Sequence, residues 1–277
     1  MTRFGSIHLS ETRKAKNAFT ILELLVAITI LVILVTVVGR VVSSASNSIV
    51  RSESYLDIDR EARLVFDRLA VDIGRMIRRR DLYYGISKNS GNDRFDFFSE
   101  VKGVSSGDAR SNYSIVNYQV NNDYALTRAV VARSWFDPFI LANDVNHNLI
   151  QLGGEYFTVM APSVFRFEYT FLLKPTSTGQ MRFSNRPYHA SEDEEEGVYD
   201  PTRIRGFRDV AAIVVGLALL DEKSRMRNVD ISQLAAQFPD SSENSDLLKS
   251  WKEVAKGLNE SEGAQNVRVY QRFFYLN

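Results

Sequence analysis

Cysteine is absent from the 277 residues of this chain. Its absence excludes disulfides, thiolate nucleophiles and cysteine metal sites, so an exported domain must be stabilised by packing alone. The chain also lacks an excess of charge of one sign, since 34 Lys and Arg residues balance 34 Asp and Glu residues. The overall charge therefore gives no indication of a nucleic acid or of a strongly acidic partner.

Signatures of catalysis and of metal binding are also scarce. The sequence has no HExxH or Walker A pattern and holds three histidines, His8, His147 and His189. His147 could join a cation site with Asp144, but its Asn- and Asp-rich surroundings are more typical of a turn. The acidic run 191–196 lies in a loop at 187–201, and consecutive carboxylates rarely converge on one calcium ion. We expect no enzyme activity, no metal and no cofactor.

A long apolar stretch is present near the N-terminus. From Phe19 to Gly39 it contains one charged residue, Glu23. As a helix, about 20 residues can cross the ~30 Å hydrocarbon layer of a membrane. The preceding residues 1–18 hold four basic side chains and one acidic side chain, which predicts that they remain in the cytoplasm while the C-terminal side crosses.

A cleaved secretory signal is the competing interpretation, because the small residues around Val42 and Ala45 could be cut. However, the apolar run is longer than the roughly 7–15 residues of a signal peptide. Glu23 would also serve no purpose there, although a carboxylate opposes membrane insertion by roughly 2.5–3.5 kcal/mol. We therefore favour a single-pass membrane protein whose assembly needs this charge.

One segment carries a resemblance to a known family. It comprises Ala18, Phe19, Thr20, Ile21, Leu22, Glu23, Leu24 and Leu25, behind the basic leader. It resembles the cleavage and methylation motif of type IV prepilins and type II secretion pseudopilins, with Ala18 in place of the usual glycine.

The resemblance implies three events at this motif. A membrane aspartyl peptidase would cleave between Ala18 and Phe19 on the cytoplasmic side, and the new N-terminus at Phe19 would be methylated. Glu23 would then pair with the Phe19 amine of a neighbouring subunit. Such pairing is physically reasonable, because two charges in a low-dielectric medium cost far less together than apart.

The helical pattern continues beyond the membrane segment. Apolar residues recur at three- and four-residue steps, at Ala62, Val65, Phe66, Leu69, Ile73, Met76 and Ile77. The charged residues between them, which include Asp59, Asp67 and Asp72, are expected on a solvated or subunit-facing surface. Arg78, Arg79 and Arg80 are predicted to end the helix, where positive charge suits the helix dipole.

Short alternating runs then predict a β-rich domain with two late helices. The expected strands cover 94–98, 114–120, 124–130, 163–173, 210–220 and 267–275, and the helices cover 231–238 and 245–258. We expect the first three strands to form an antiparallel meander on the helix face at 62–77. Strand 210–220 is uncharged and is expected at the centre of a sheet. The fold class is α+β and pilin-like, a long N-terminal helix packed on an antiparallel sheet.

The predicted organisation has four parts. They are a leader at 1–18, a transmembrane part at 19–42, an extracytoplasmic helix half at 43–80 and a globular domain at 81–277. This order also resembles the J-type minor pseudopilins of type II secretion. The segments 66–72 and 267–277 resemble the prepilin-type proteins called Verru_Chthon cassette protein C, a name that brings no established activity with it.

These resemblances imply a non-catalytic minor pilin or pseudopilin subunit of a bacterial inner membrane, with its C-terminal domain in the periplasm or at the cell surface. Its partners would be the prepilin peptidase and other pilin or pseudopilin subunits, contacted through the N-terminal helix. No nucleic acid partner is expected. The alternative is a single-pass anchored extracytoplasmic binding protein or enzyme that does not polymerise.

Overall fold

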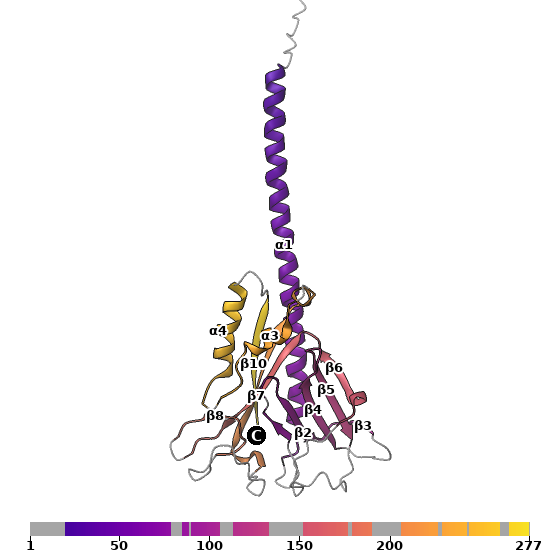
Figure 1. The fold of residues 1–277 in the computed structure, drawn as a ribbon, viewed down its shortest axis with the longest axis vertical. Coiled ribbons are helices and arrows are strands. Elements are labelled where there is room, and N and C mark those ends of the chain that lie inside the picture. Colours follow the sequence, from indigo (N-terminus) through magenta and orange to yellow (C-terminus); the bar gives the residue numbers. More distant parts are fainter. Residues whose placement is uncertain are drawn as a thin grey trace, which may run out of the picture. The chain divides into compact units, whose positions relative to one another are not determined.

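The computed structural model describes residues 20–78, 85–88, 90–105, 113–132, 152–176, 179–189, 206–226, 229–242, 244–260 and 266–276. The chain divides into two compact units, one that ends at Ser52 and one from Glu53 to Asn277. Helix α1 (Ile21–Gly74) contributes residues to both units (Figure 1).

In the first unit, helix α1 is apolar and exposed. Among the described residues, one helical segment, Ile21–Ser46, is long and apolar enough to cross a membrane. Its exposed large apolar side chains have between 48% and 85% of their surface accessible. The hydroxyls of Thr29 and Thr36 donate to the carbonyls of Leu25 and Val32 at 2.8 and 2.7 Å. These donors are thus satisfied within the helix, as an apolar medium requires.

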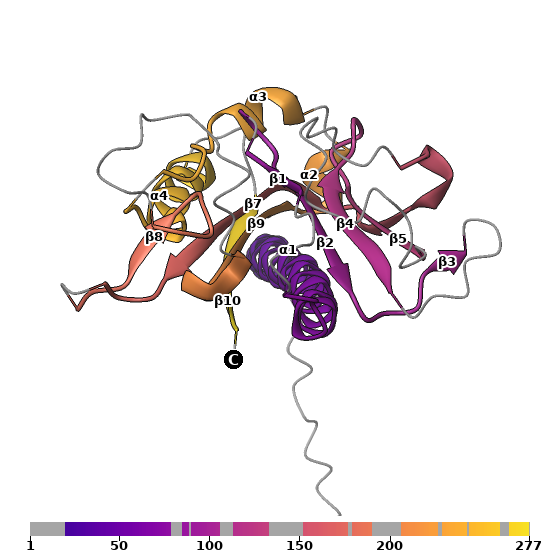
Figure 2. The same cartoon turned by 90° about the horizontal axis from the view of Figure 1, so that it is seen from below.

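In the second unit, helix α1 buries one face. The predicted apolar face is confirmed from Ala62 to Met76 and begins one turn earlier, at Ile58, whereas Ile77, which was predicted to belong to it, is only half-buried. Its buried residues are Ile58, Ala62, Val65, Phe66, Leu69 and Ile73, followed by Met76 beyond the helix end. They form one core with apolar side chains from two β-sheets, so this part of the helix is covered by the chain's own domain (Figure 2).

The helix ends at Gly74, before the three arginines that were predicted to end it. The Ile77 amide donates to the Phe98 carbonyl at 2.9 Å, and the Glu100 amide donates to the Arg75 carbonyl at 3.0 Å. The helix ends here because the backbone after Gly74 forms hydrogen bonds with the residues at the end of the 94–99 strand. Arg78 is exposed, while residues 79 and 80 lie outside the described residues.

The first sheet has six strands in the described residues. They are β1 (Gly85–Ser87), β2 (Arg94–Ser99), β3 (Val104–Ser105), β4 (Ser114–Val120), β5 (Leu126–Ala132) and β6 (Phe157–Ala161). The order is β1-β2-β4-β5-β3, with β6 also paired to β5. The predicted antiparallel meander is confirmed in β2, β4 and β5. Asn121 forms the turn before β5, since its side-chain oxygen accepts from the Ala125 amide at 2.9 Å.

The second sheet has the order β10-β9-β7-β8. Its strands are β7 (Val164–Leu173), β8 (Arg182–Ser184), β9 (Val210–Leu220) and β10 (Val267–Tyr275). Strand β9 lies between β7 and β10 and is almost entirely buried, which confirms the predicted central strand. One face of this sheet packs on α1, where the rings of Phe66 and Phe274 are 6.3 Å apart.

Two late helices cover the other face of the second sheet. They are α3 (Ile231–Ala236) and α4 (Leu247–Glu260), and they share a core with Phe165 and Leu220. Gly216 on β9 lets α4 approach, because a Cβ at this position would lie 2.7 Å from Leu247 Cδ2. A short helix, α2 (Glu222–Arg225), follows β9 directly. The α+β, pilin-like arrangement is thus as predicted.

Candidate functional site

Glu23 lies in the first turn of helix α1 and forms a capping box with Thr20. Glu23 Oε2 accepts from the Thr20 amide at 3.2 Å, and the Glu23 amide donates to Thr20 Oγ1 at 3.2 Å. This reciprocal arrangement satisfies two backbone donors that a helix start otherwise leaves free. The Thr-x-x-Glu spacing of the motif therefore also serves the start of the helix.

The surroundings of Glu23 are apolar and open. Leu22 and Leu24 beside it are 72% and 56% exposed. The helix N-terminus carries partial positive charge, which favours a carboxylate in the first turn but does not neutralise it. In a membrane this carboxylate would still need a cationic partner. Ala18 and Phe19 lie outside the described residues, so cleavage, methylation and the pairing of Glu23 remain predictions.

A buried carboxylate on helix α1, Asp72, forms hydrogen bonds with side chains of the first sheet. Asp72 is fully buried and accepts from Tyr118 Oη at 2.6 Å and from Arg128 Nε at 2.7 Å. Arg68 Nε is 3.4 Å from the same carboxylate. Burial, and then the charge of Asp72, raise the pKa of Tyr118, so its hydroxyl stays a neutral donor.

This location corrects the expectation that Asp72 lies on a solvated surface. Asp72 follows the buried Leu69 by three residues and precedes the buried Met76 by four, so it shares their helix face. The helical spacing therefore already placed Asp72 on the buried face. It was assigned to the surface because it is charged.

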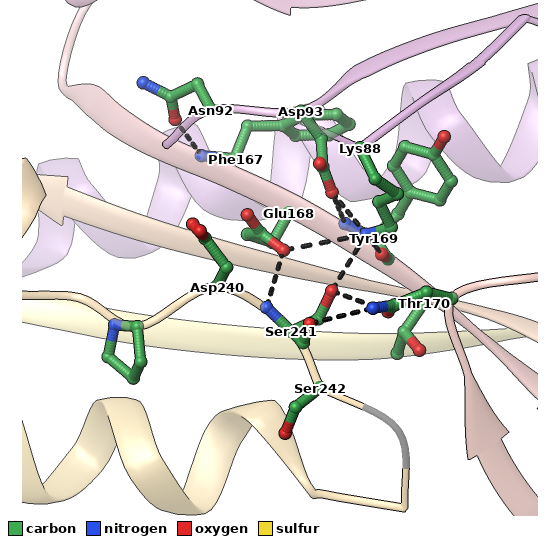
Figure 3. A network of polar contacts seen from close by, with 12 residues as sticks. Lys88, Asn92, Asp93, Phe167, Glu168, Tyr169, Thr170, Asp240, Ser241 and Ser242 are labelled. Carbon is green, nitrogen blue, oxygen red and sulfur yellow. Dashed lines mark hydrogen bonds and ion pairs between the residues drawn. The ribbon is translucent and has the colours of Figure 1, made fainter. Parts of the chain in front are cut away.

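A second polar network lies between the two sheets (Figure 3). Lys88, just after β1, is 2.5 Å from Asp93 Oδ2 and 3.6 Å from Glu168 Oε2 of strand β7. It also donates to Ser241 Oγ at 2.9 Å and to the carbonyl of Tyr169. One ammonium group therefore ties the β1–β2 segment to β7 and to the segment before α4.

Arg166 extends this network toward α3. Its guanidinium is 3.2 Å from Glu168 Oε1 and also pairs with Asp240. Burial raises the pKa of Asp93 from 3.8 to about 7, with Glu168 adding to the shift and Lys88 opposing it. The network was not predicted, because its members are far apart in the sequence and each resembles an ordinary surface charge.

The proximity of Ser241 to Lys88 invites comparison with a Ser–Lys catalytic pair. A catalytic lysine in such a pair takes a proton from the serine, which requires a neutral amine. Here the Lys88 amine donates to Asp93 Oδ2, to the Tyr169 carbonyl and to Ser241 Oγ itself, which is the reverse of the direction that proton removal from the serine requires. Ser241 Oγ donates instead to Asn185 Oδ1 at 2.9 Å. The arrangement favours a structural role.

Other sequence candidates give no second site. His189 Nε2 is 3.0 Å from the Lys174 carbonyl, while Asp144, His147 and the run 191–196 lie outside the described residues. Residues 103–107 match GxSxG and residues 99–102 match SxxK, and neither match was recognised as a candidate site from the sequence. Ser105 pairs with Ala132 within a strand rather than lying on a strand-to-helix turn, and Ser99 Oγ donates to the Asp72 carbonyl at 2.8 Å. Within the described ranges, no group of three or more His, Asp or Glu residues is placed to hold a metal.

The comparisons with known proteins concern the N-terminal segment. Residues 13–39 match the family model described as the prokaryotic N-terminal methylation motif. The match includes Ala18, Phe19 and Glu23. No curated protein matches the chain. The motif indicates a pilin-like precursor that is processed by prepilin peptidase, and it implies assembly with other pilins. Together, the methylation motif and the apolar helix behind it support a type IV prepilin-like protein.

Proposed function

We propose that this chain is the precursor of a minor pilin or pseudopilin subunit without catalytic activity of its own. It would join a type IV pilus-like filament or the pseudopilus of a type II secretion system. The observation that carries this proposal is the matched motif at 13–39 followed by the exposed apolar segment Ile21–Ser46.

Processing would convert a membrane precursor into an assembly unit. Cleavage after Ala18 removes the basic leader and creates a positive amine at Phe19, on the cytoplasmic side of the inner membrane. Glu23 then neutralises the Phe19 amine of a neighbouring subunit, which removes the cost of two unpaired charges in an apolar medium. The β-rich domain lies across the membrane, in the periplasm or at the cell surface.

The exposed side chains of the first unit support this mode of assembly. Soluble monomers rarely present such a continuous apolar surface, and its length fits the hydrocarbon layer of a membrane. Lipid would cover the surface before assembly, and helices of other subunits would cover it in the filament. The backbone and hydroxyl donors of the helix are satisfied internally, so both environments are accessible to it.

The capping box allows a sharp test of Glu23. Glu23→Gln removes the charge but keeps a side chain that can complete a capping box, whereas Thr20→Ala removes the capping partner and keeps the charge. We expect Glu23→Gln to abolish incorporation into filaments while membrane insertion and cleavage persist. Thr20→Ala should reduce incorporation much less, because loss of a cap costs about 0.5–2 kcal/mol of helix stability.

Incorporation is measured as the fraction of the subunit recovered with sheared filaments or cross-linked to other subunits. Equal incorporation of Glu23→Gln and wild type would show that charge pairing is not the role of Glu23. A chain that is never cleaved and never found with other subunits would contradict the whole proposal.

A further inference from the structure

A cleft of about 680 Å³ opens in the second unit between three segments. Its lining comes from the start of this unit's part of α1, from the turn before β7 and from α2. The lining carries five carboxylates and two cations. The carboxylates are Glu53, Asp57, Glu61, Asp221 and Glu222, and the cations are Lys223 and Arg225. The cleft therefore has an excess of negative charge.

The cations of the cleft do not balance this excess. Arg225 donates through Nη1 to the Pro162 carbonyl and through Nη2 to the Asp123 carbonyl, so its guanidinium is engaged by the turns beside it. Lys223 is exposed. Two cleft carboxylates have partners within the described residues: Glu61 Oε1 accepts from the Ser163 amide at 2.8 Å, and Asp57 forms an exposed ion pair with Arg60 at 3.4 Å. An exposed pair of this kind contributes little.

Asp221 is a buried carboxylate of the cleft that lacks a hydrogen-bond donor for one of its oxygens. It is 3% exposed, and its Oδ1 has no hydrogen-bond partner in the part of the chain that the structure describes. Asp221 occupies the N-cap position of α2, yet its side chain accepts no capping hydrogen bond. A buried carboxylate oxygen without a donor is strongly unfavourable and is expected to have a partner in the functional state.

We propose that this cleft receives the side chain of an arginine or lysine from another subunit when the filament assembles. The proposal rests on the proposed function and adds a second contact, made by the folded domain rather than by the apolar helix. A guanidinium or ammonium group would supply the donors that Asp221 lacks and would offset the charge of Asp57 and Glu222.

The shape of the cleft favours an organic cation over a metal ion. Metal binding needs converging ligands, and no described group of three or more His, Asp or Glu residues is so placed. Ile58 and Pro162 line the cleft, and Met226 at its edge is 73% exposed. Such apolar atoms can pack along the aliphatic stem of a basic side chain, and exposed methionine adapts readily to a protein partner.

The first test reverses charge at the edge of the cleft in the full chain. Asp57→Lys combined with Glu222→Lys should lower incorporation into filaments by about fivefold or more, with cleavage at Phe19 unchanged. Glu253→Lys is the matched control, since Glu253 is exposed on α4 and outside the cleft, and it should assemble like wild type. Asp221→Asn provides a second, nearly isosteric variant, and an unchanged thermal midpoint shows that each variant folds.

The outcomes separate this proposal from the proposed function. If the double variant assembles like wild type while Glu23→Gln does not, the cleft proposal is overturned and the assembly function stands. If Glu23→Gln also assembles normally, the role proposed for the helix fails as well.

A second test identifies the chemistry of the ligand with the full chain in detergent. N-acetyl-arginine amide should raise the thermal midpoint of the wild type and have less effect on Asp221→Asn. A rise with calcium chloride and none with the arginine probe would make the cleft a metal site and would overturn the proposal.

Discussion

Helix α1 presents the same kind of residue in two environments. Leu31 is 58% exposed in the first unit, whereas Leu69 is completely buried in the second. Both belong to one helix, so local helix formation does not distinguish them. The difference lies in what covers the side chains, because the β-rich domain covers Leu69, whereas the described part of the first unit, from residue 20 to residue 52, leaves Leu31 exposed. The length and apolar character of the segment around Leu31 fit a membrane anchor, and we propose that a membrane or other subunits cover it.

The largest expected effect comes from the buried polar group of the second unit. Asp72→Ala removes the carboxylate that Arg128 and Tyr118 share and leaves both of these groups unpaired in the core. We expect a loss of about 3–5 kcal/mol in the free energy of unfolding. Denaturant unfolding of the full chain in detergent, followed by tryptophan fluorescence, to which the buried Trp251 contributes, measures this loss.

Asp67→Ala is the control for Asp72. Asp67 pairs with Arg272 at 2.8 Å, but both side chains are largely exposed, at 71% and 44%. Its removal should cost less than about 1 kcal/mol. Equal losses in the two variants would show that burial of Asp72 is not what fastens the helix to the sheet.

Replacement of each of the two leucines by alanine tests whether only Leu69 stabilises the fold. Leu69→Ala should lower the free energy of unfolding of the β-rich domain by about 2–5 kcal/mol, because it leaves a cavity in a packed core. Leu31→Ala should leave this free energy unchanged, since Leu31 belongs to the first unit. A similar loss in both variants would mean that the first unit is stabilised by contacts within the chain.

Much of the fold could be predicted from periodicity. The recurrence of apolar residues every three and four positions identified the buried helix face. Alternating or continuous apolar runs identified strands β2, β4, β5, β7, β9 and β10. The two-residue β3 and the three-residue β1 and β8 are too short to have a readable period. The division into two sheets was not predicted, because strand order depends on contacts between distant segments.

Polar residues could be assigned a role from the sequence when they belong to a contiguous motif, but not when their partners are distant in the sequence. Glu23 was identified because the motif is contiguous in the sequence. The partners of Asp72 and Lys88 come from residues 56 and 153 positions away, at Arg128 and Ser241. The acidic cleft likewise joins Asp57 to Asp221, which no local pattern connects.

A last expected effect concerns pH. The folded pKa of Asp93 is about 7, above its ordinary value of 3.8, so folding binds a proton at this carboxyl. Its contribution to stability is complete below about pH 4 and is lost as the pH rises through about 7. Asp93 faces Lys88 and Glu168, and Arg166 and Asp240 lie further along the network.

Asp93→Asn isolates this contribution, because the amide cannot titrate. The thermal midpoint of the wild type should fall relative to that of Asp93→Asn between about pH 5 and about pH 8. A constant difference between the two proteins across this range would mean that Asp93 does not change its protonation on folding.

The central claim is that the N-terminal segment is processed as a prepilin before the chain is assembled. The most direct measurement is the mass and N-terminal sequence of the chain purified from the membranes of a cell that has a prepilin peptidase. The account predicts a mature chain that begins at Phe19 with a methylated amine, and an intact precursor when the peptidase is absent. A chain that keeps Met1 in the presence of the peptidase, or that begins after Ala45, would contradict it.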